Sequence, residues 1–453
     1  MIMVGGYGKL GAPANLIKAV ANSSAKNLTL ICGIASCPEK GSPVQELIEK
    51  KKVGTIYTSS VGNNAAILDQ YKNGLLEVNL VPLGTLAEKA RSGGFGIPAF
   101  YSSVGLGTFH EEGGIPTKYA KDGKTVLSVN LAKEKRMFKG KDYLLEKTIL
   151  ADYSLIKAWK ADTKGNCILK LANRNLNPDF AISGKICIVE AEEVVEAGQL
   201  DGDDVHISGI FVHRVVKATP APQDFNYEGK CQIGTGESGK ARELIAKRAA
   251  QEIKSGSYVV LGCGLAKAVQ MYVPEGADLH VMIPETGIFG AIMKSNMEDL
   301  TDGCLKPVGL RKNAAIVKTS DGFCALRGGH LTMTFSEAFQ VSCDGDIANI
   351  EKGDKVLPSP GISMDLAASS PVTPLVALME MTTDGKPNLV KECTYKVAGR
   401  KCVAKLITDM GVFEFKADGM HLTELAPGVE VDQIKSKTPC EFKVSPNLKT
   451  MSI

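Results

Sequence analysis

Glu285 is the side chain whose surroundings point most clearly to chemistry. It is the lone carboxylate in the uncharged stretch 281–293, and it directly follows the apolar run 279–283. A short apolar run of this kind favours a buried strand, and open α/β sheets bind ligands beyond the carboxyl ends of their strands. A carboxylate placed there can act as a base, as a nucleophile or as a buried structural acid.

A glycine-rich turn near the amino end is a second candidate. Gly6, Gly8 and Gly11 have the spacing of dinucleotide-binding turns, in which a pyrophosphate approaches a helix N-terminus. That fingerprint also needs an acidic residue about 20 positions further on, whereas the first carboxylate after the next apolar run is Glu39. A tight strand-to-helix turn is the favoured interpretation, and a site for a phosphate-bearing ligand other than NAD is the alternative.

Backbone groups form a third candidate. The loop 358–366 contains two prolines and Gly361, and peptide N–H groups in such a turn can stabilise an oxyanion. The pattern alone is also typical of an ordinary Pro/Gly loop. The six histidines include no pair at i,i+4 spacing and no Cys-x-x-Cys occurs, so we expect no metal site.

The elements that hold these residues repeat along the chain. In the first half an apolar start leads to Gly11, a helix over 14–21 and a strand over 28–32; in the second, a strand over 258–261 leads to Gly262, a helix over about 265–272 and a strand over 279–283. From glycine to strand centre both units span 19 residues (30 − 11 and 281 − 262). Such units favour a parallel sheet and indicate an internal duplication. Ile34 is the counterpart of Glu285, so only the second half carries the carboxylate.

A segment rich in proline and glycine separates the two halves. We therefore predict an α/β fold with two related open α/β domains in one chain: residues 1–216, a linker over 217–237, and residues 238–453. Three local elements are also predicted. They are a helix over 85–93 that begins with a capping box, a hairpin of 155–159 with 167–171, and a solvated helix face for the acidic run 190–196.

Composition excludes several classes of protein. The 453 residues carry 53 basic and 50 acidic side chains, a net charge of +3, which is too small for a general nucleic-acid or membrane-surface binder. No apolar stretch approaches the roughly 20 residues of a membrane span, and the apolar opening 1–4 is too short for a signal peptide. Most of the twelve cysteines lie in apolar runs without paired spacing. We expect them to be buried, reduced thiols in a reducing compartment.

Several motifs together resemble those of the class I coenzyme A transferases, specifically the fused-subunit succinyl-CoA:3-oxoacid type, over essentially the whole chain. The segments that carry the resemblance are 5–13 (GGYGKLGAP, with Tyr for the usual Phe), 96–101 (GIPAFY), 113–119 (GGIPTKY), 156–162 (IKAWKAD), 326–330 (LRGGH), 340–342 (QVS) and 345–349 (GDIAN). The family's Ser-Glu-Asn-Gly signature falls on 284–287, where the glutamate and glycine are kept. Its Gly-Gly-Ala-Met-Asp-Leu loop falls on 361–366, and its Ser-Asn-Asn-Ala stretch reads CGIA at 32–35. The last change leaves the choice of acid open.

The resemblance implies a ping-pong CoA transfer. Glu285 would attack the thioester of an acyl-CoA, pass through a mixed anhydride and carry CoA as a glutamyl thioester until a second acid reverses both steps. Gly361 would supply a backbone oxyanion contact, and Gly262, Gly264 and Gly287 would belong to loops that bind CoA. No permanently bound cofactor and no metal are expected, because CoA is a substrate.

The resemblance also implies partners and a compartment. The substrates would be an acyl-CoA, with succinyl-CoA expected, and a small carboxylic acid such as a 3-oxoacid or acetate. A homodimer is expected, in the mitochondrial matrix or a mitochondrion-derived organelle, with the cytoplasm as the alternative; no nucleic acid and no membrane are expected as partners. Two other functions stay open: a nucleotide-dependent oxidoreductase that uses Gly6, Gly8 and Gly11, and a non-catalytic ligand sensor on the same fold.

Overall fold

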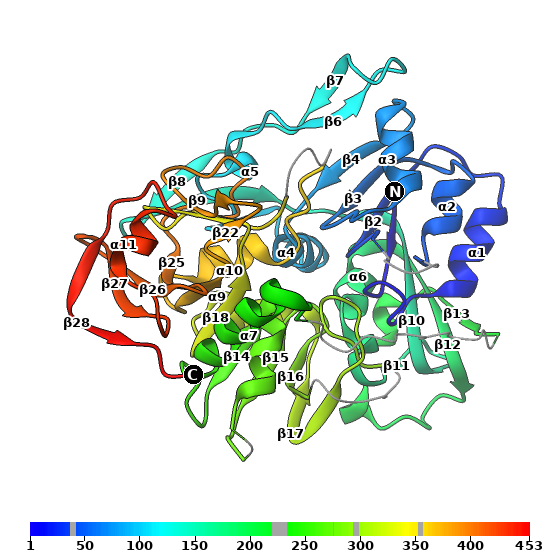
Figure 1. Ribbon diagram of the computed structural model, residues 1–453. Coiled ribbons are helices and arrows are strands. Elements are labelled where there is room, and N and C mark those ends of the chain that lie inside the picture. The colour runs from blue at the N-terminus through cyan, green and yellow to red at the C-terminus, as the bar shows by residue number, and fades with distance from the viewer. Residues whose placement is uncertain (37–41, 220–232, 275, 293–298, 352–356) are drawn as a thin grey trace.

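Two large sheets, one from each half of the chain, form the framework of the protein (Figure 1). The computed structural model describes residues 1–36, 42–219, 233–274, 276–292, 299–351 and 357–453. Within these residues no strand of one large sheet pairs with a strand of the other. The predicted α/β class, with two repeated domain-like halves, is confirmed.

The first sheet is built from parallel strands. Its order is β13 (Arg214–Lys217), β12 (Gly184–Val195), β10 (Ala151–Asp162), β1 (Ile2–Val4), β2 (Leu28–Cys32), β3 (Val53–Thr58) and β4 (Glu77–Leu80), with β11 (Cys167–Ile168) antiparallel to β10. All three residues of β1 are buried, as expected for a central parallel strand covered on both faces. The helices of this half are α1 (Ala14–Asn22), α2 (Gln45–Glu49), α3 (Ala65–Lys72), α4 (Leu83–Gly94), α5 (Phe109–Glu112) and α6 (Asn177–Ser183).

The second sheet has a parallel centre with antiparallel pairs on both sides, and its last two strands pair in parallel again. Its order is β17 (Gly309–Ile316), β16 (Ile288–Ile292), β15 (His280–Ile283), β14 (Tyr258–Leu261), β18 (Met333–Glu337), β21 (Leu375–Leu378), β25 (Val403–Ile407), β26 (Gly411–Lys416), β27 (Gly419–Leu425) and β28 (Lys443–Thr450). The helices of this half are α7 (Gly236–Ala250), α8 (Leu265–Ala268), which continues as a 3₁₀ turn (Val269–Tyr272), α9 (Thr319–Arg327), α10 (Ser363–Ser369) and α11 (Val431–Lys435).

The predicted repeat is confirmed at the centre of both sheets. β1 pairs in parallel with β2 on one side and β10 on the other, and β14 pairs in parallel with β15 and β18. The turn after β1 carries Gly11 and the turn after β14 carries Gly262. Equivalent glycine turns therefore follow corresponding strands of the two sheets.

The three local predictions are confirmed only in part. The helix predicted over 85–93 is present as α4, but it begins at Leu83 after Pro82, so Thr85 lies inside it and is buried instead of capping it. Residues 190–195 of the acidic run belong to strand β12 and not to a helix. Glu190 is buried there: it accepts a hydrogen bond from the Leu16 N–H at 3.0 Å and faces the Lys157 ammonium at 3.6 Å. The predicted hairpin is present between β10 and β11, but its pairs are Lys160 with Ile168 and Ala161 with Cys167, closer to the turn than the predicted 155–159 with 167–171.

The halves share one hydrophobic core. Leu83 and Leu86 of α4 belong to the same buried cluster as Phe323 of α9 and Met364 of α10. Helix α4 packs against both of those helices and lies near the centre of the molecule in Figure 1. Apolar packing around this helix is thus one of the contacts that hold the two halves together, and a second buried cluster joins Leu10 and Ala172 to the second half.

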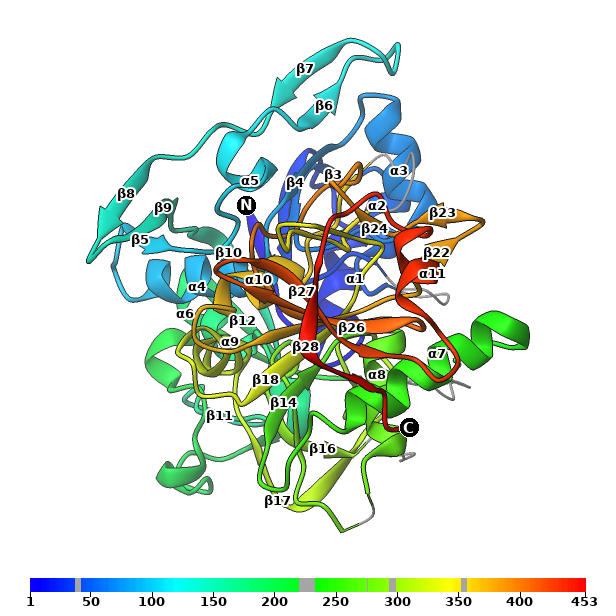
Figure 2. The same cartoon turned by 60° about the vertical axis from the view of Figure 1, so that its left-hand side comes forward.

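Smaller strands complete the described chain. β5 (Ala99–Ser102), β8 (Lys135–Phe138) and β9 (Lys141–Lys147) form one small sheet and β6 (Pro116–Tyr119) pairs with β7 (Val126–Val129); Figure 2 shows both groups projecting from the first half. The second half adds β19 (Gln340–Ser342) with β20 (Ile347–Ala348) and β24 (Leu389–Val390), and β22 (Thr382–Thr383) with β23 (Lys386–Pro387). Among the described helices, none is both long enough and apolar enough for a membrane span.

Candidate active site

A cavity of about 660 Å³ lies where the two halves meet, and Glu285 is part of its wall. The first half contributes Tyr7 and Ile34, so the counterpart positions of the repeat, 34 and 285, line the same space. The remaining lining residues are Ser36, Ser60, Gly62, Asn63, Gly262, Cys263, Gly264, Gly303, Cys304, Leu305, Ser336, Glu337, Phe339, Asn349, Ser359, Pro360, Gly361, Ile362, Ser363 and Leu366. The cavity therefore needs both halves of the chain.

Glu285 lies in a tight turn between β15 and β16. The Gly287 N–H donates to the Pro284 carbonyl at 3.3 Å, and Gly287 has a φ of +70°, which only glycine adopts readily. The Thr319 hydroxyl donates to the Glu285 carbonyl at 2.9 Å, and the Thr286 hydroxyl donates to a neighbouring loop at 2.8 Å. The backbone that carries the carboxylate is thus fixed on both sides.

The Glu285 side chain is 8 % exposed. Burial raises its pKa from an ordinary 4.5 to about 7, and the negative charges of Asp302 and Asp365 add to the shift. Both effects disfavour the carboxylate form. A carboxyl group near half-ionisation at neutral pH is suited to nucleophilic or acid–base chemistry.

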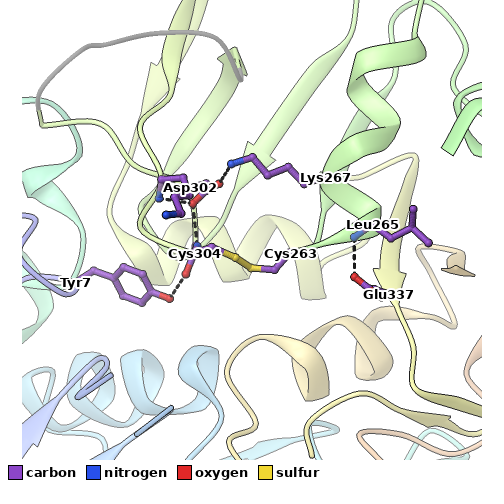
Figure 3. The surroundings of a disulfide bond; sticks show 9 residues. Tyr7, Cys263, Leu265, Lys267, Asp302, Cys304 and Glu337 are labelled. Carbon is purple, nitrogen blue, oxygen red and sulfur yellow. Dashed lines mark hydrogen bonds and ion pairs between the residues drawn. A yellow bond between two sulfur atoms is a disulfide. The ribbon is translucent and has the colours of Figure 1, made fainter. Parts of the chain in front are cut away.

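The loop after residue 299 holds a glycine against this carboxyl group. Asp302 accepts hydrogen bonds from the backbone N–H groups of Cys304 at 2.9 Å and Lys306 at 2.8 Å, and it forms an ion pair with Lys267 of α8 (Figure 3). At Gly303 an added Cβ would lie 2.5 Å from the Glu285 carboxyl carbon. Only glycine therefore leaves room for Glu285 in this position.

Tyr7 connects the first half to the same loop. Its phenol donates a hydrogen bond to the Gly303 carbonyl at 2.9 Å. Burial raises the pKa of Tyr7 well above its usual range, and the charges of Glu285 and Asp302 add to this, so the phenol keeps its proton. Tyr7 and Gly303 were not predicted as site residues. The one signal for Tyr7 was its position inside the glycine-rich turn.

The expectation that the cysteines are reduced thiols is wrong for Cys263 and Cys304. The turn before α8 and the loop after residue 299 bring their Cα atoms to 6.3 Å, and the two form a disulfide bond on the cavity wall (Figure 3). The apolar context is confirmed for other cysteines in the described chain: the buried free thiols are Cys32, Cys167, Cys187, Cys402 and Cys440.

The glycines predicted to bind CoA have different surroundings. Gly262 and Gly264 line the cavity, and Gly264 has a φ of +71°. A Cβ on Gly264 would overlap the carboxylate of Glu337, which accepts the Leu265 N–H at 2.6 Å (Figure 3). Gly287 is not among the described lining residues; it shapes the turn that carries Glu285.

Gly361 also lies on the cavity wall. Its N–H donates to the Ser59 carbonyl at 3.1 Å, and its carbonyl accepts the Leu83 N–H at 2.9 Å. In this conformation the Gly361 N–H is therefore already engaged. Its predicted oxyanion contact stays a prediction that requires the bond to Ser59 to open.

The nucleotide interpretation of the glycine-rich turn does not agree with its packing. Gly6, Gly8 and Gly11 all have positive φ, which explains the choice of glycine. A Cβ on Gly8 would lie 2.8 Å from the Leu305 side chain, and one on Gly11 would lie 2.9 Å from the Asn173 carbonyl. Contacts within the chain therefore account for these glycines, as the interpretation of a tight strand-to-helix turn expects.

The arrangement can support acyl transfer on a carboxylate. A buried carboxyl group faces a cavity whose wall also carries hydroxyl and amide groups, including Ser36, Ser60 and Asn63. Within the described residues, no group of three or more His, Cys, Asp or Glu side chains is arranged to hold a metal ion.

Comparison with known proteins identifies similar sequences. The profile of the coenzyme A transferase family matches residues 1–218 and 242–437. The chain is 36 % identical to the mitochondrial succinyl-CoA:3-ketoacid coenzyme A transferase 2A of Mus musculus, over 99 % of this chain and 88 % of the mouse protein. The human mitochondrial succinyl-CoA:3-ketoacid coenzyme A transferase 2 is 35 % identical with the same coverage.

A solved structure bears on the architecture. The acyl-CoA transferase YdiF of Escherichia coli O157:H7 has the same fold, with a TM-score of 0.76 at 22 % identity. The match covers 100 % of this chain and 92 % of the bacterial one. Both halves of the chain, and not one of them alone, therefore follow the fold of that transferase.

Proposed function

Because the chain belongs to the coenzyme A transferase family, we propose that it moves coenzyme A from succinyl-CoA to a small carboxylic acid, with a 3-oxoacid as the favoured acceptor. The substrate pair is taken from the names of its relatives in mouse and human. The observation that carries the proposal is the Glu285 carboxyl group, which is withdrawn from water and faces a cavity built by both halves.

Glu285 is the nucleophile of this mechanism. Its carboxylate attacks the thioester carbonyl, the C–S bond breaks, and a mixed anhydride and a CoA thiolate result. The thiolate then attacks the glutamyl carbonyl, which releases the first acid and leaves CoA on Glu285 as a thioester. The second acid attacks this thioester and the same two steps run in reverse.

The surroundings of Glu285 favour acylation of its carboxylate. A carboxylate that burial destabilises gains more by acylation than a solvated one does, because the acyl form is neutral. The same burial limits hydrolysis of the anhydride. The neutral Tyr7 phenol and Gly303 keep the carboxyl group in place without adding a charge.

The other roles follow from position. Gly262 and Gly264 are proposed to border the path of CoA, and the Gly361 N–H to contact an oxyanion after it leaves Ser59. Hydroxyl and amide groups of Ser60 and Asn63 can donate hydrogen bonds to the carboxylate of the acid.

Organisation and location are proposed as follows. Residues 1–216 and 238–453 act as one catalytic unit joined through 217–237, because the cavity takes side chains from both large segments. A homodimer and a mitochondrial or related compartment are proposed from the resemblance and from the names of the relatives.

Covalent labelling tests the proposal. Enzyme incubated with succinyl-CoA and no acceptor acid is expected to carry CoA as a thioester on the peptide that contains Glu285. The label should survive removal of free CoA and disappear when acetoacetate is added, with formation of the new acyl-CoA.

Glu285→Ala is expected to lose both the label and turnover while its circular dichroism spectrum is unchanged. A matched control is Glu237→Gln, which changes an exposed glutamate on α7 and should keep both. A CoA thioester on another residue, or near-normal turnover of Glu285→Ala, would refute the assignment. Binding of acyl-CoA with no turnover of any acid would favour the ligand sensor.

A further inference from the structure

The disulfide between Cys263 and Cys304 is a reactive group that the transfer mechanism does not use. The two cysteines lie in different loops, 41 residues apart in the chain, and both line the cavity that Glu285 faces. They also border, again with Glu285, a small pocket behind that cavity. The sulfur–sulfur bond is therefore on the wall of the space where acyl transfer is proposed to occur.

The two cysteine residues differ in exposure. Cys263 is exposed, whereas Cys304 is half-buried. Thiolates attack disulfides at the more accessible sulfur, and exposed disulfides are the labile ones. An incoming thiolate is thus directed to Cys263, with Cys304 as the leaving group.

The proposed reaction itself brings a thiol to this place. A glutamyl thioester on Glu285 requires the CoA sulfur to reach bonding distance of that carboxyl group. Gly303 contacts the Glu285 carboxyl group and is adjacent to Cys304. A bound CoA thiol is therefore held at a high effective concentration beside the disulfide.

We propose that Cys263 is a site of covalent attachment for coenzyme A, which opens the Cys263–Cys304 disulfide and remains as a mixed disulfide. The CoA thiolate forms a bond to the Cys263 sulfur, the Cys263–Cys304 bond breaks, and Cys304 leaves as a thiolate that takes a proton from solvent. One disulfide replaces another, so no oxidant or reductant is consumed. The attached CoA occupies the cavity and blocks transfer until a thiol removes it. This inference rests on the proposed function, because it needs CoA to bind in this cavity.

The test uses the full-length enzyme purified without reductant. It is incubated with CoA thiol alone, quenched with iodoacetamide and analysed by peptide mass spectrometry. We expect CoA on the Cys263 peptide, an alkylated Cys304, loss of transfer activity in proportion to the adduct, and recovery of both by dithiothreitol. CoA should react at least about tenfold faster than glutathione at equal concentration.

Two controls address specificity. CoA that lacks its sulfur atom should give no adduct. Cys324→Ser, which removes the exposed free thiol in a separate cavity of about 980 Å³, should leave the adduct unchanged. Three results would each overturn the proposal. They are equal rates with CoA and glutathione, an adduct on Cys304, and alkylation of both thiols before CoA is added.

Glu285→Gln separates this inference from the proposed function. The variant cannot form the thioester but keeps the disulfide, so it should still take up CoA on Cys263. A wild-type enzyme that forms the thioester on Glu285 but never the mixed disulfide contradicts this inference alone. A wild-type enzyme that forms the mixed disulfide but no thioester contradicts the proposed function alone.

Discussion

Replacing Glu285 by glutamine should make the folded protein more stable, and increasingly so as the pH rises. Burial moves the pKa of Glu285 from 4.5 to about 7, so the folded state binds this proton more tightly than the unfolded state does. The folded protein therefore loses free energy of unfolding as the pH rises from about 4.5 through 7. This pKa difference corresponds to a loss of about 3 kcal/mol in the free energy of unfolding once the pH is above 7. Glutamine has nearly the same shape and no charge, so the variant avoids this loss.

The assay is urea-induced unfolding of both proteins at pH 5 and pH 8.5. At pH 5 the folded wild type keeps the proton on Glu285, and most of the penalty is absent. Between the two pH values the advantage of Glu285→Gln should grow by roughly 2 to 3 kcal/mol. Glu237→Gln, an exposed position on α7, should show no such growth. An advantage that is the same at both pH values would refute the conclusion that Glu285 is a desolvated carboxyl group.

Three further predictions concern the same site. Because only the carboxylate is nucleophilic, kcat/KM for the first half-reaction should fall about tenfold per pH unit below pH 7; a profile that is flat from pH 5 to 8 would contradict this. Gly303→Ala places a Cβ 2.5 Å from the Glu285 carboxyl carbon and should lower kcat/KM about 100-fold at unchanged circular dichroism; an undiminished rate would show that the contact does not position Glu285. Tyr7→Phe removes the 2.9 Å hydrogen bond to the Gly303 carbonyl and should lower the free energy of unfolding by about 1 kcal/mol, measured by urea unfolding, with a smaller loss of rate than Gly303→Ala.

The parts of the fold that depend on local pattern could be predicted from the sequence. Strand β2 begins and ends where the apolar run 28–32 does, and the repeat of strand, glycine turn, helix and strand predicted the parallel sheet centres. The helix prediction for the acidic run 190–196 was wrong because the partners of Glu190 are distant in the sequence. The Leu16 N–H is 174 residues away, and a buried ion pair with Lys157 replaces the expected solvent. Propensity cannot show such tertiary compensation.

The candidate active site also contains residues that could be predicted from the sequence and residues that could not. Glu285 could be predicted because a lone carboxylate after a buried strand is visible in the chain itself, although its role as nucleophile stays a prediction. The contact between Gly303 and the Glu285 carboxyl group could not be predicted, because it depends on how the loop that carries Gly303 folds back. The Cys263–Cys304 pair has the same explanation: the two residues are 41 positions apart and neither belongs to a recognisable motif. Spacing along a chain carries no information about contacts that only the folded loops create.

The shared core around α4 has a consequence for how the protein is made. Leu86 packs in one cluster with Met364, which the ribosome adds 278 residues later (364 − 86). At roughly 5–20 residues per second, that interval is about 14 to 56 seconds. During this time the emerging first half presents an uncovered apolar surface and one wall of a cavity without its carboxylate. We therefore expect the nascent chain to be inactive and prone to aggregation until the second half folds onto α4.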